Sequence, residues 1–165
     1  MSAYGTSAAA IAYHAARGNS AWAAATPDAQ DQARLRASDY IDNNWRMLFQ
    51  GYKTGGRAQE REWPRKDVLV WNGAQQEGLD SSAVPVEIEN ATYEAALREL
   101  ASPGYFNPDI IPGKSKKSVS VSGAVSVEYW SDDMRPVVEK IGLILGPLFA
   151  VTGGLSSGLS GEVRF

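Results

Sequence analysis

Two acidic side chains have the spacing of a catalytic pair. Asp39 and Asp42 lie three residues apart in a segment expected to be helical, so both carboxylates share one face. A working pair of carboxylates needs surroundings that separate the two pKa values. Acid pairs on a solvated helix face are far commoner than such dyads, and we interpret this pair as surface charge.

A serine motif also matches formally. Gly154 to Gly158 reads G-x-S-x-G, the pattern of a nucleophile elbow, whose serine must sit between a strand and a helix. The motif lies in a glycine- and serine-rich stretch that predicts neither element. The only histidine, His14, lies far upstream, opposite to the usual order in hydrolases, and is interpreted as a surface or hydrogen-bonded residue. The chain has no cysteine, which excludes thiolate metal sites, and no calcium-loop spacing occurs. We therefore expect no enzyme, no metal and no cofactor.

Basic side chains gather in two stretches of a chain whose formal net charge is -3. We interpret both stretches as solvated loops, because an acidic chain with dispersed bases is a poor candidate for strong strand binding. If DNA passes close to the protein, five of these side chains are the candidates for contact with phosphate: Arg57, Arg61, Lys114, Lys116 and Lys117.

The composition predicts one folded domain with a terminal tail. With 165 residues, 44% of them hydrophobic, the chain can form a single core. The expected helical domain spans residues 1–149, and the glycine- and serine-rich residues 150–165 are expected to form a flexible tail. No apolar run reaches the length of a bilayer span, and no secretion signal is visible. We expect no membrane contact, and the composition is compatible with a cytoplasm.

The expected fold class is mainly α, a bundle of about four helices with one extended β-arm or hairpin. Thr6 or Ser7 begins a short helix over residues 8–17, and Thr26-Pro27-Asp28 begins a long one that runs to about residue 49. Two further helices are expected over about 85–101 and from Pro136 to Leu145. Along the long helix the predicted buried face comprises Ala33, Ala37, Tyr40, Ile41, Trp45, Leu48 and Phe49.

Three segments complete the prediction. Residues 50–82 are expected to form a long loop, anchored at Trp63-Pro64 and at Val68 to Trp71. Residues 117–130 are expected to form a β-arm that pairs with a neighbouring subunit, because its apolar residues alternate: Val119, Val121, Val125, Val127 and Tyr129. Four apolar residues of the tail are spaced to fill small pockets on a partner: Leu155, Leu159, Val163 and Phe165.

Several short sequence motifs occur in the same order as in one phage family. They are Tyr13 to Asn19 with Trp22, Ala37 to Asp42, Trp63 to Arg65, Val84-Pro85, Ala91 to Leu97 and Val125 to Tyr129. The chain resembles the head-tail connector adaptors of tailed bacteriophages, of the small helical-bundle type. Many of these carry the label "putative DnaT-like single-stranded-DNA-binding protein". The resemblance covers roughly residues 8 to 149.

This resemblance implies a structural virion protein, present in the host cytoplasm during assembly. It implies a homo-dodecameric ring beneath the portal protein. The C-terminal tail of each subunit would grip the portal, and a completion protein of the phage tail or neck would follow the ring. Genomic DNA in the lumen would meet the ring without sequence specificity. Two alternatives stay open: a single-stranded-DNA-binding replication accessory, and another neck or tail-completion protein.

Overall fold

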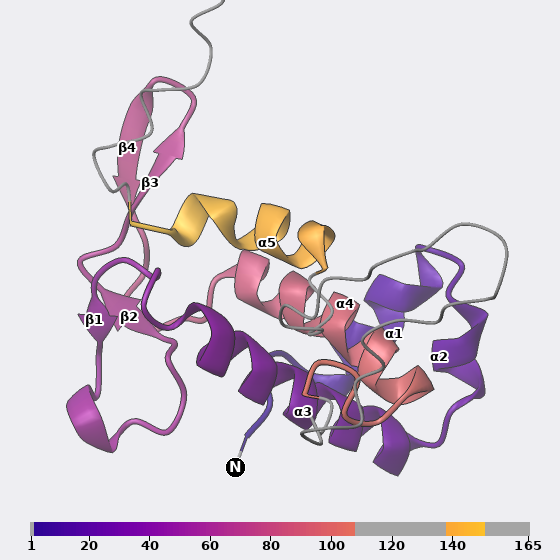
Figure 1. Cartoon of the computed structure of the whole chain (residues 1–165). Helices are drawn as coiled ribbons and strands as arrows, with labels where there is room; N and C mark the ends of the chain where they lie inside the picture. Colours follow the sequence, from indigo (N-terminus) through magenta and orange to yellow (C-terminus); the bar gives the residue numbers. More distant parts are fainter. Residues whose placement is uncertain (1, 108–137, 151–165) are drawn as a thin grey trace, which may run out of the picture.

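The computed structural model describes residues 2–107 and 138–150, and it confirms a mainly helical fold with small β-hairpins (Figure 1). The helices are α1 Ser7–Ala15, α2 Ser20–Ala24, α3 Pro27–Trp45, α4 Val86–Ala101 and α5 Glu139–Leu145. The strands are β1 Tyr52–Lys53, β2 Arg65–Lys66, β3 Leu69–Asn72 and β4 Gln75–Gly78. Two 3-10 turns span Gly56–Ala58 and Gly146–Leu148.

The helix starts lie where the sequence predicts them. The Thr6 side chain accepts a hydrogen bond from the amide of Ala9 at 3.1 Å, and Thr26 accepts one from Ala29 at 3.3 Å. Each threonine thereby satisfies one of the amides that a helix start leaves without a partner. The next helix, α4, begins directly after Pro85. Side-chain caps and prolines therefore identified these three starts from the sequence.

The end of α3 was predicted too late. The helix ends at Trp45, whereas the prediction carried it to about residue 49, and Leu48 is half exposed instead of buried. Beyond the helix the backbone pairs with the segment that follows α5: the amide of Gln50 donates to Leu148 O at 3.1 Å, and the amide of Ala150 donates to Leu48 O at 2.7 Å. This long-range pairing replaces the last predicted turn, and a local pattern cannot reveal it.

The buried face of α1 includes the histidine. Ala10 and His14 are buried, while Ile11 is half exposed. The short helix α2 covers this face and places Trp22 against the His14 ring, with the centroids 4.4 Å apart. His14 is held further by the side chain of Asn19, whose Nδ2 donates to His14 Nδ1 at 3.0 Å.

The core lies between α3 and α4, and α5 covers α4 (Figure 1). Small side chains at the contact let the two long helices approach closely. Larger groups complete the core at its ends, where Tyr40 stacks on Phe106 and where Ile141 of α5 is fully buried. The fully buried apolar residues of α3 and α4 are Ala33, Ala37, Ile41, Ile88, Ala91, Ala95 and Ala96.

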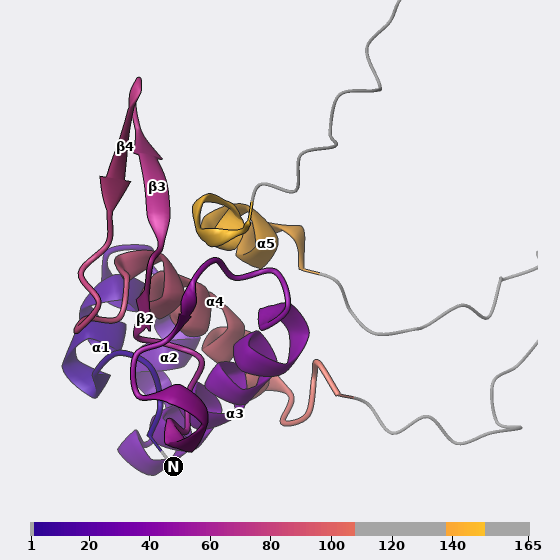
Figure 2. The ribbon, with the colours of Figure 1, turned by 90° about the vertical axis from the view of Figure 1, so that its left-hand side faces the viewer.

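The segment 50–82 contains more structure than the predicted loop. β1 pairs with β2, and β3 pairs with β4 in a hairpin closed by Gly73-Ala74, with a positive φ of 63° at Gly73. The hairpin projects from the helical body in both views (Figures 1 and 2). Gly73 between two apolar-containing runs was the missed signal, because glycine at the first position of a two-residue loop is typical of tight hairpins.

The expected anchors of this segment divide into two groups. Trp63 is buried, with 2% of its surface exposed, and Val68 is buried as well, so these anchors are confirmed. Leu69 and Trp71 are 49% and 62% exposed, so as anchors they were wrong. Both lie on the projecting hairpin rather than on the body.

Other predictions fall outside the described residues. They concern the β-arm 117–130, the tail from residue 151 and the lysines at 114, 116 and 117, and they stay predictions. The fourth predicted helix is seen from Glu139 to Leu145 as α5, and Gly146-Pro147 follows it in a 3-10 turn.

Candidate functional site

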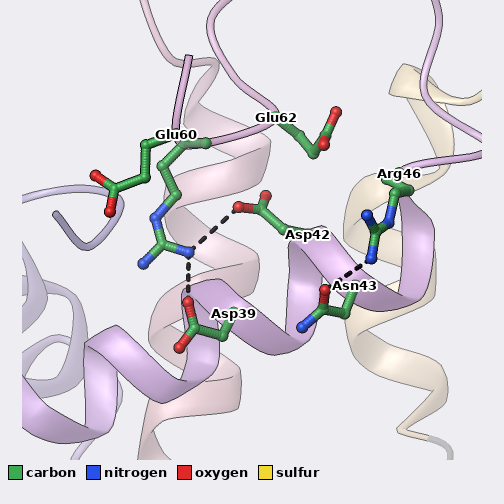
Figure 3. Close-up of a pocket in the computed structure, with 7 residues that line it drawn as sticks. Asp39, Asp42, Asn43, Arg46, Glu60 and Glu62 are labelled. Atoms are coloured by element: carbon green, nitrogen blue, oxygen red, sulfur yellow. Dashed lines mark hydrogen bonds and ion pairs between the residues drawn. The ribbon is translucent and has the colours of Figure 1, made fainter. Parts of the chain in front are cut away.

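An arginine from the long segment is inserted against the acid pair of α3. Arg61 is 8% exposed, and its Nη1 lies 2.7 Å from Asp39 Oδ1 and 3.2 Å from Asp42 Oδ2 (Figure 3). Its Nε donates to the carbonyl of Ser2 at 2.6 Å. The acid pair is therefore an anchor for the segment 50–66, and neither carboxylate is available as an unpaired base.

Tyr4 connects the same cluster to the start of the chain. Its hydroxyl donates to Asp42 Oδ1 at 2.5 Å and accepts from the amide of Trp63 at 3.1 Å. Burial raises the pKa of Tyr4 well above its usual range, and the Asp42 charge adds to that effect. Burial also raises the pKa of the Asp42 carboxyl, against the opposing hydrogen bonds from Tyr4 and Arg61. The cluster thus joins three parts of the chain through groups that are costly to leave unpaired.

A hollow of about 200 Å³ opens beside this cluster (Figure 3). Four of its side chains are carboxylates and two are guanidiniums, which gives the hollow an acidic balance: its lining is Asp39, Asp42, Asn43, Arg46, Glu60, Arg61 and Glu62. Such a lining repels phosphate. Within residues 2–107 and 138–150, no group of three or more histidine, aspartate or glutamate residues is placed to hold a metal ion.

A second cluster of charged side chains has more cations than carboxylates. Glu94 of α4 is buried and lies within salt-bridge distance of three cations: Lys140 Nζ at 2.6 Å, Arg98 Nη1 at 3.5 Å and Arg17 Nε at 3.9 Å. Tyr13 also donates to Glu94, at 2.9 Å. Burial raises the pKa of Glu94, but the hydrogen bonds from Lys140 and Tyr13 outweigh burial and hold the pKa below its usual value. One carboxylate here meets three cations.

This second cluster borders a hollow of about 520 Å³. Its charged lining consists of Glu94 and the three cations, and the Arg17 guanidinium lies over the Tyr13 ring, 3.4 Å from its centroid. Cations beside an aromatic ring are the groups that single strands meet in binding proteins. The sequence did not indicate this site, because Arg17 follows α1, Arg98 lies on α4 and Lys140 lies on α5, and the three come together only in the fold.

The candidate DNA contacts of the long segment have different positions. Arg57 is exposed in the 3-10 turn Gly56–Ala58. Arg61 is buried and occupied by Asp39 and Asp42, so we no longer propose it as a contact with phosphate. His14 is buried too, and burial lowers its pKa below the usual value.

Residues 1–164 match the model of a family described as "Putative DnaT-like ssDNA binding protein". The chain belongs to this family. The family description names a binding activity and no reaction, and it confirms the label that accompanied the sequence resemblance. It says nothing of phage connectors. Searches of curated proteins and of solved structures gave no match to the chain. Within the described part of this family member, no helix is both long and apolar enough to cross a membrane.

Proposed function

We propose that this protein is a structural subunit that joins other protein chains: the adaptor of the ring between the portal and the tail of a tailed bacteriophage. The observation that carries the proposal is the projecting hairpin β3–β4. It exposes Leu69 and Trp71 to solvent, and between residues 69 and 78 it has no lysine or arginine. Exposed apolar side chains beside an open strand edge bind protein chains rather than phosphate.

The charge distribution supports the same proposal. Eight of the eleven lysine and arginine residues in the described part of the chain form ion pairs with described carboxylates: Arg17, Arg34, Arg36, Lys53, Arg61, Arg65, Arg98 and Lys140. Paired cations release fewer counterions when a nucleic acid binds, and that release is the main source of sequence-independent affinity. The described surface therefore favours weak contact with DNA.

The attachment to the portal is assigned to the tail beyond Ala150. Ala150 is bonded to Leu48, and the hairpin base is tied to the same place, because Gln50 Nε2 donates to Phe149 O at 2.9 Å and Gln50 Oε1 accepts from the amide of Leu69 at 3.4 Å. The tail thus leaves the body beside the hairpin base. Many weak tails around a ring add their affinities through a high effective concentration.

Deletion of residues 153–165 tests this assignment. The pairing of Ala150 with Leu48 is retained, so the truncated chain is expected to unfold at the same denaturant concentration as the full chain. It is expected to lose attachment to portal-bearing heads in a co-sedimentation assay. A full-length variant with serine at the four apolar tail positions should also lose attachment to the heads. These positions are Leu155, Leu159, Val163 and Phe165. If the truncated chain binds heads normally, the portal contact lies on the helical body.

The family description favours a second candidate function, single-stranded-DNA binding as a replication accessory. The cationic hollow beside Glu94 is the described site that suits it. Titration with single-stranded DNA near physiological salt separates the two functions. Our proposal expects weak binding that falls steeply with salt. Submicromolar binding that Arg17→Gln weakens, while Arg46→Gln of the acidic hollow leaves it unchanged, would favour the accessory. An electron micrograph of a ring on the portal would favour the adaptor.

A further inference from the structure

The hairpin has one open edge. The amide of Leu79 donates to Val68 O at 3.0 Å, in register with the β3–β4 ladder, so alternate residues along each strand turn their backbone groups outward. On β4 these outward residues are Gln76 and Gly78. Among residues 2–107 and 138–150, this sheet has only the two strands β3 and β4. The other edge, along β3, is partly occupied at its base, because Leu69 donates to Gln50 Oε1.

The two faces of the hairpin also differ. Leu69 and Trp71 lie on one face, because alternate residues of a strand point the same way. Their cross-strand neighbours Gly78 and Gln76 leave that face uncovered, and all of β4 is exposed. A strand added beside β4 would extend this apolar face if its own apolar residues alternated.

We propose that the β4 edge accepts residues 119–129 of a second copy of this chain as an added strand. The inference rests on the proposed function, since it names the joint between neighbouring subunits of the ring. In residues 119–129, valine or tyrosine occupies alternate positions, apart from Gly123, and serine fills most places between them. Such a segment offers one apolar face to continue that of Leu69 and Trp71, and one polar face to solvent.

The ring of the proposed function needs a joint between copies, and this selects a second copy over the same chain as the source of the added strand. Asn107 and Val138 are the described residues on either side of this segment. The β4 edge and the arm are different parts of the chain, so a joint between them is a head-to-tail contact, and repeating such a contact closes a ring when the rotation permits.

Disulfide trapping between two different chains tests the joint. The chain has no cysteine, so single-cysteine variants are unambiguous. One variant carries Glu77→Cys, at a position on the polar face of β4. In the arm, Ser120, Ser122 and Ser126 are replaced by cysteine one at a time. Neighbouring strands hold such residues within the Cα separation that a disulfide needs, about 4.4–6.8 Å. Mixing the Glu77→Cys chain with an arm variant should give a mixed disulfide dimer under mild oxidation.

Asp28→Cys, exposed at the start of α3, is the matched control. The arm variants are expected to link to it at least tenfold more slowly than to Glu77→Cys. Equal rates, or no mixed dimer with any of the three serine positions, would overturn the joint. A chain carrying both cysteines that closes its disulfide within one molecule at every concentration would also overturn it.

A backbone substitution gives a second readout. Gln76→Pro removes an outward amide, a position that proline tolerates in edge strands, so the hairpin ladder keeps its own hydrogen bonds. Gln76→Thr is the matched control. We expect the proline variant to retain its helical circular dichroism and to lose oligomers in light scattering, while the threonine variant assembles normally.

The outcomes separate this inference from the proposed function. Rings that bind portal-bearing heads but tolerate Gln76→Pro and give no mixed disulfide would overturn the joint alone. Oligomers that trap as expected but do not bind heads would overturn the adaptor function alone. A chain that stays monomeric at every concentration would overturn both.

Discussion

The long segment between α3 and α4 has two halves of opposite character. Residues 50–66 are tied to the body by buried contacts: Trp63 packs edge-on against Phe49, and Arg65 donates to the carbonyls of Gln50 and Gly51 at 2.7 Å each. Residues 69–78 form a hairpin whose largest side chain, Trp71, is exposed. The two halves adjoin in sequence and share one loop-like composition.

The difference shows which large apolar residues serve folding. Trp63 is followed by Pro64 and flanked by arginines that donate to carboxylates or carbonyls on the body, so the stretch is buried with most of its polar groups paired. Two buried nitrogen atoms, Trp63 Nε1 and Arg61 Nη2, have no hydrogen-bond partner among the described residues. Trp71 is flanked by Val70 and Asn72 in a two-stranded ribbon that has only part of one face against the body. An isolated hairpin has little stability of its own. An exposed tryptophan kept on such a ribbon fits a surface for another chain.

The largest expected effect is at Trp63. Trp63→Ala removes a fully packed ring from the core and should lower the free energy of unfolding by about 3–5 kcal/mol. Chemical denaturation followed by far-ultraviolet circular dichroism measures the change. A loss below about 1 kcal/mol would mean that residues 50–66 are not held as the contacts imply.

A matched pair of glycines gives the next effect. Gly51 and Gly73 both have a φ of 63°, a region that disfavours side chains. A Cβ at Gly51 would also collide with the carbonyl oxygen of Lys66, whereas one at Gly73 would meet nothing within 4 Å. Gly51→Ala should therefore cost about 2–4 kcal/mol of unfolding free energy and Gly73→Ala about 1–2, because only the first adds a backbone clash to the conformational strain. Equal thermal shifts for the two variants would contradict the distinction.

The sequence predicted the halves unequally, for physical reasons. Caps and prolines are local, so the starts of α1, α3 and α4 could be predicted, as could the burial of Trp63. The pairing of Arg61 with Asp39 could not, because it joins residues 22 positions apart and each residue alone suits a solvated surface. The cationic hollow was missed for the same reason. The hairpin, in contrast, has a local signal in Gly73, so it could have been predicted from the sequence.

Arg61 should show a smaller effect than the glycine clash. Arg61→Met leaves Asp42 partly buried without its cation, and we expect a loss of about 2–3 kcal/mol, below the range for a fully buried pair because the hollow admits water. Arg57→Met on the same segment is the control and should change the unfolding free energy by less than about 0.5 kcal/mol. Adding Asp42→Asn to Arg61→Met should recover part of the loss, since the stranded charge is removed. Simple additivity of the two substitutions would mean that the pair is not coupled.

The smallest expected effect on stability is at Trp71. It separates the hairpin most clearly from residues 50–66. Trp71→Ser removes a side chain that is 62% exposed, so its unfolding free energy should stay within about 0.5 kcal/mol of the unsubstituted chain. Assembly should respond differently, because the indole of Trp71 supplies much of the apolar face that an added strand would cover. We expect the oligomer to dissociate at a protein concentration at least tenfold higher than for the unsubstituted chain, measured by sedimentation velocity. A stability loss like that of Trp63→Ala would show that the hairpin belongs to the folded core. Unchanged stability together with unchanged assembly would show that Trp71 serves neither core nor joint.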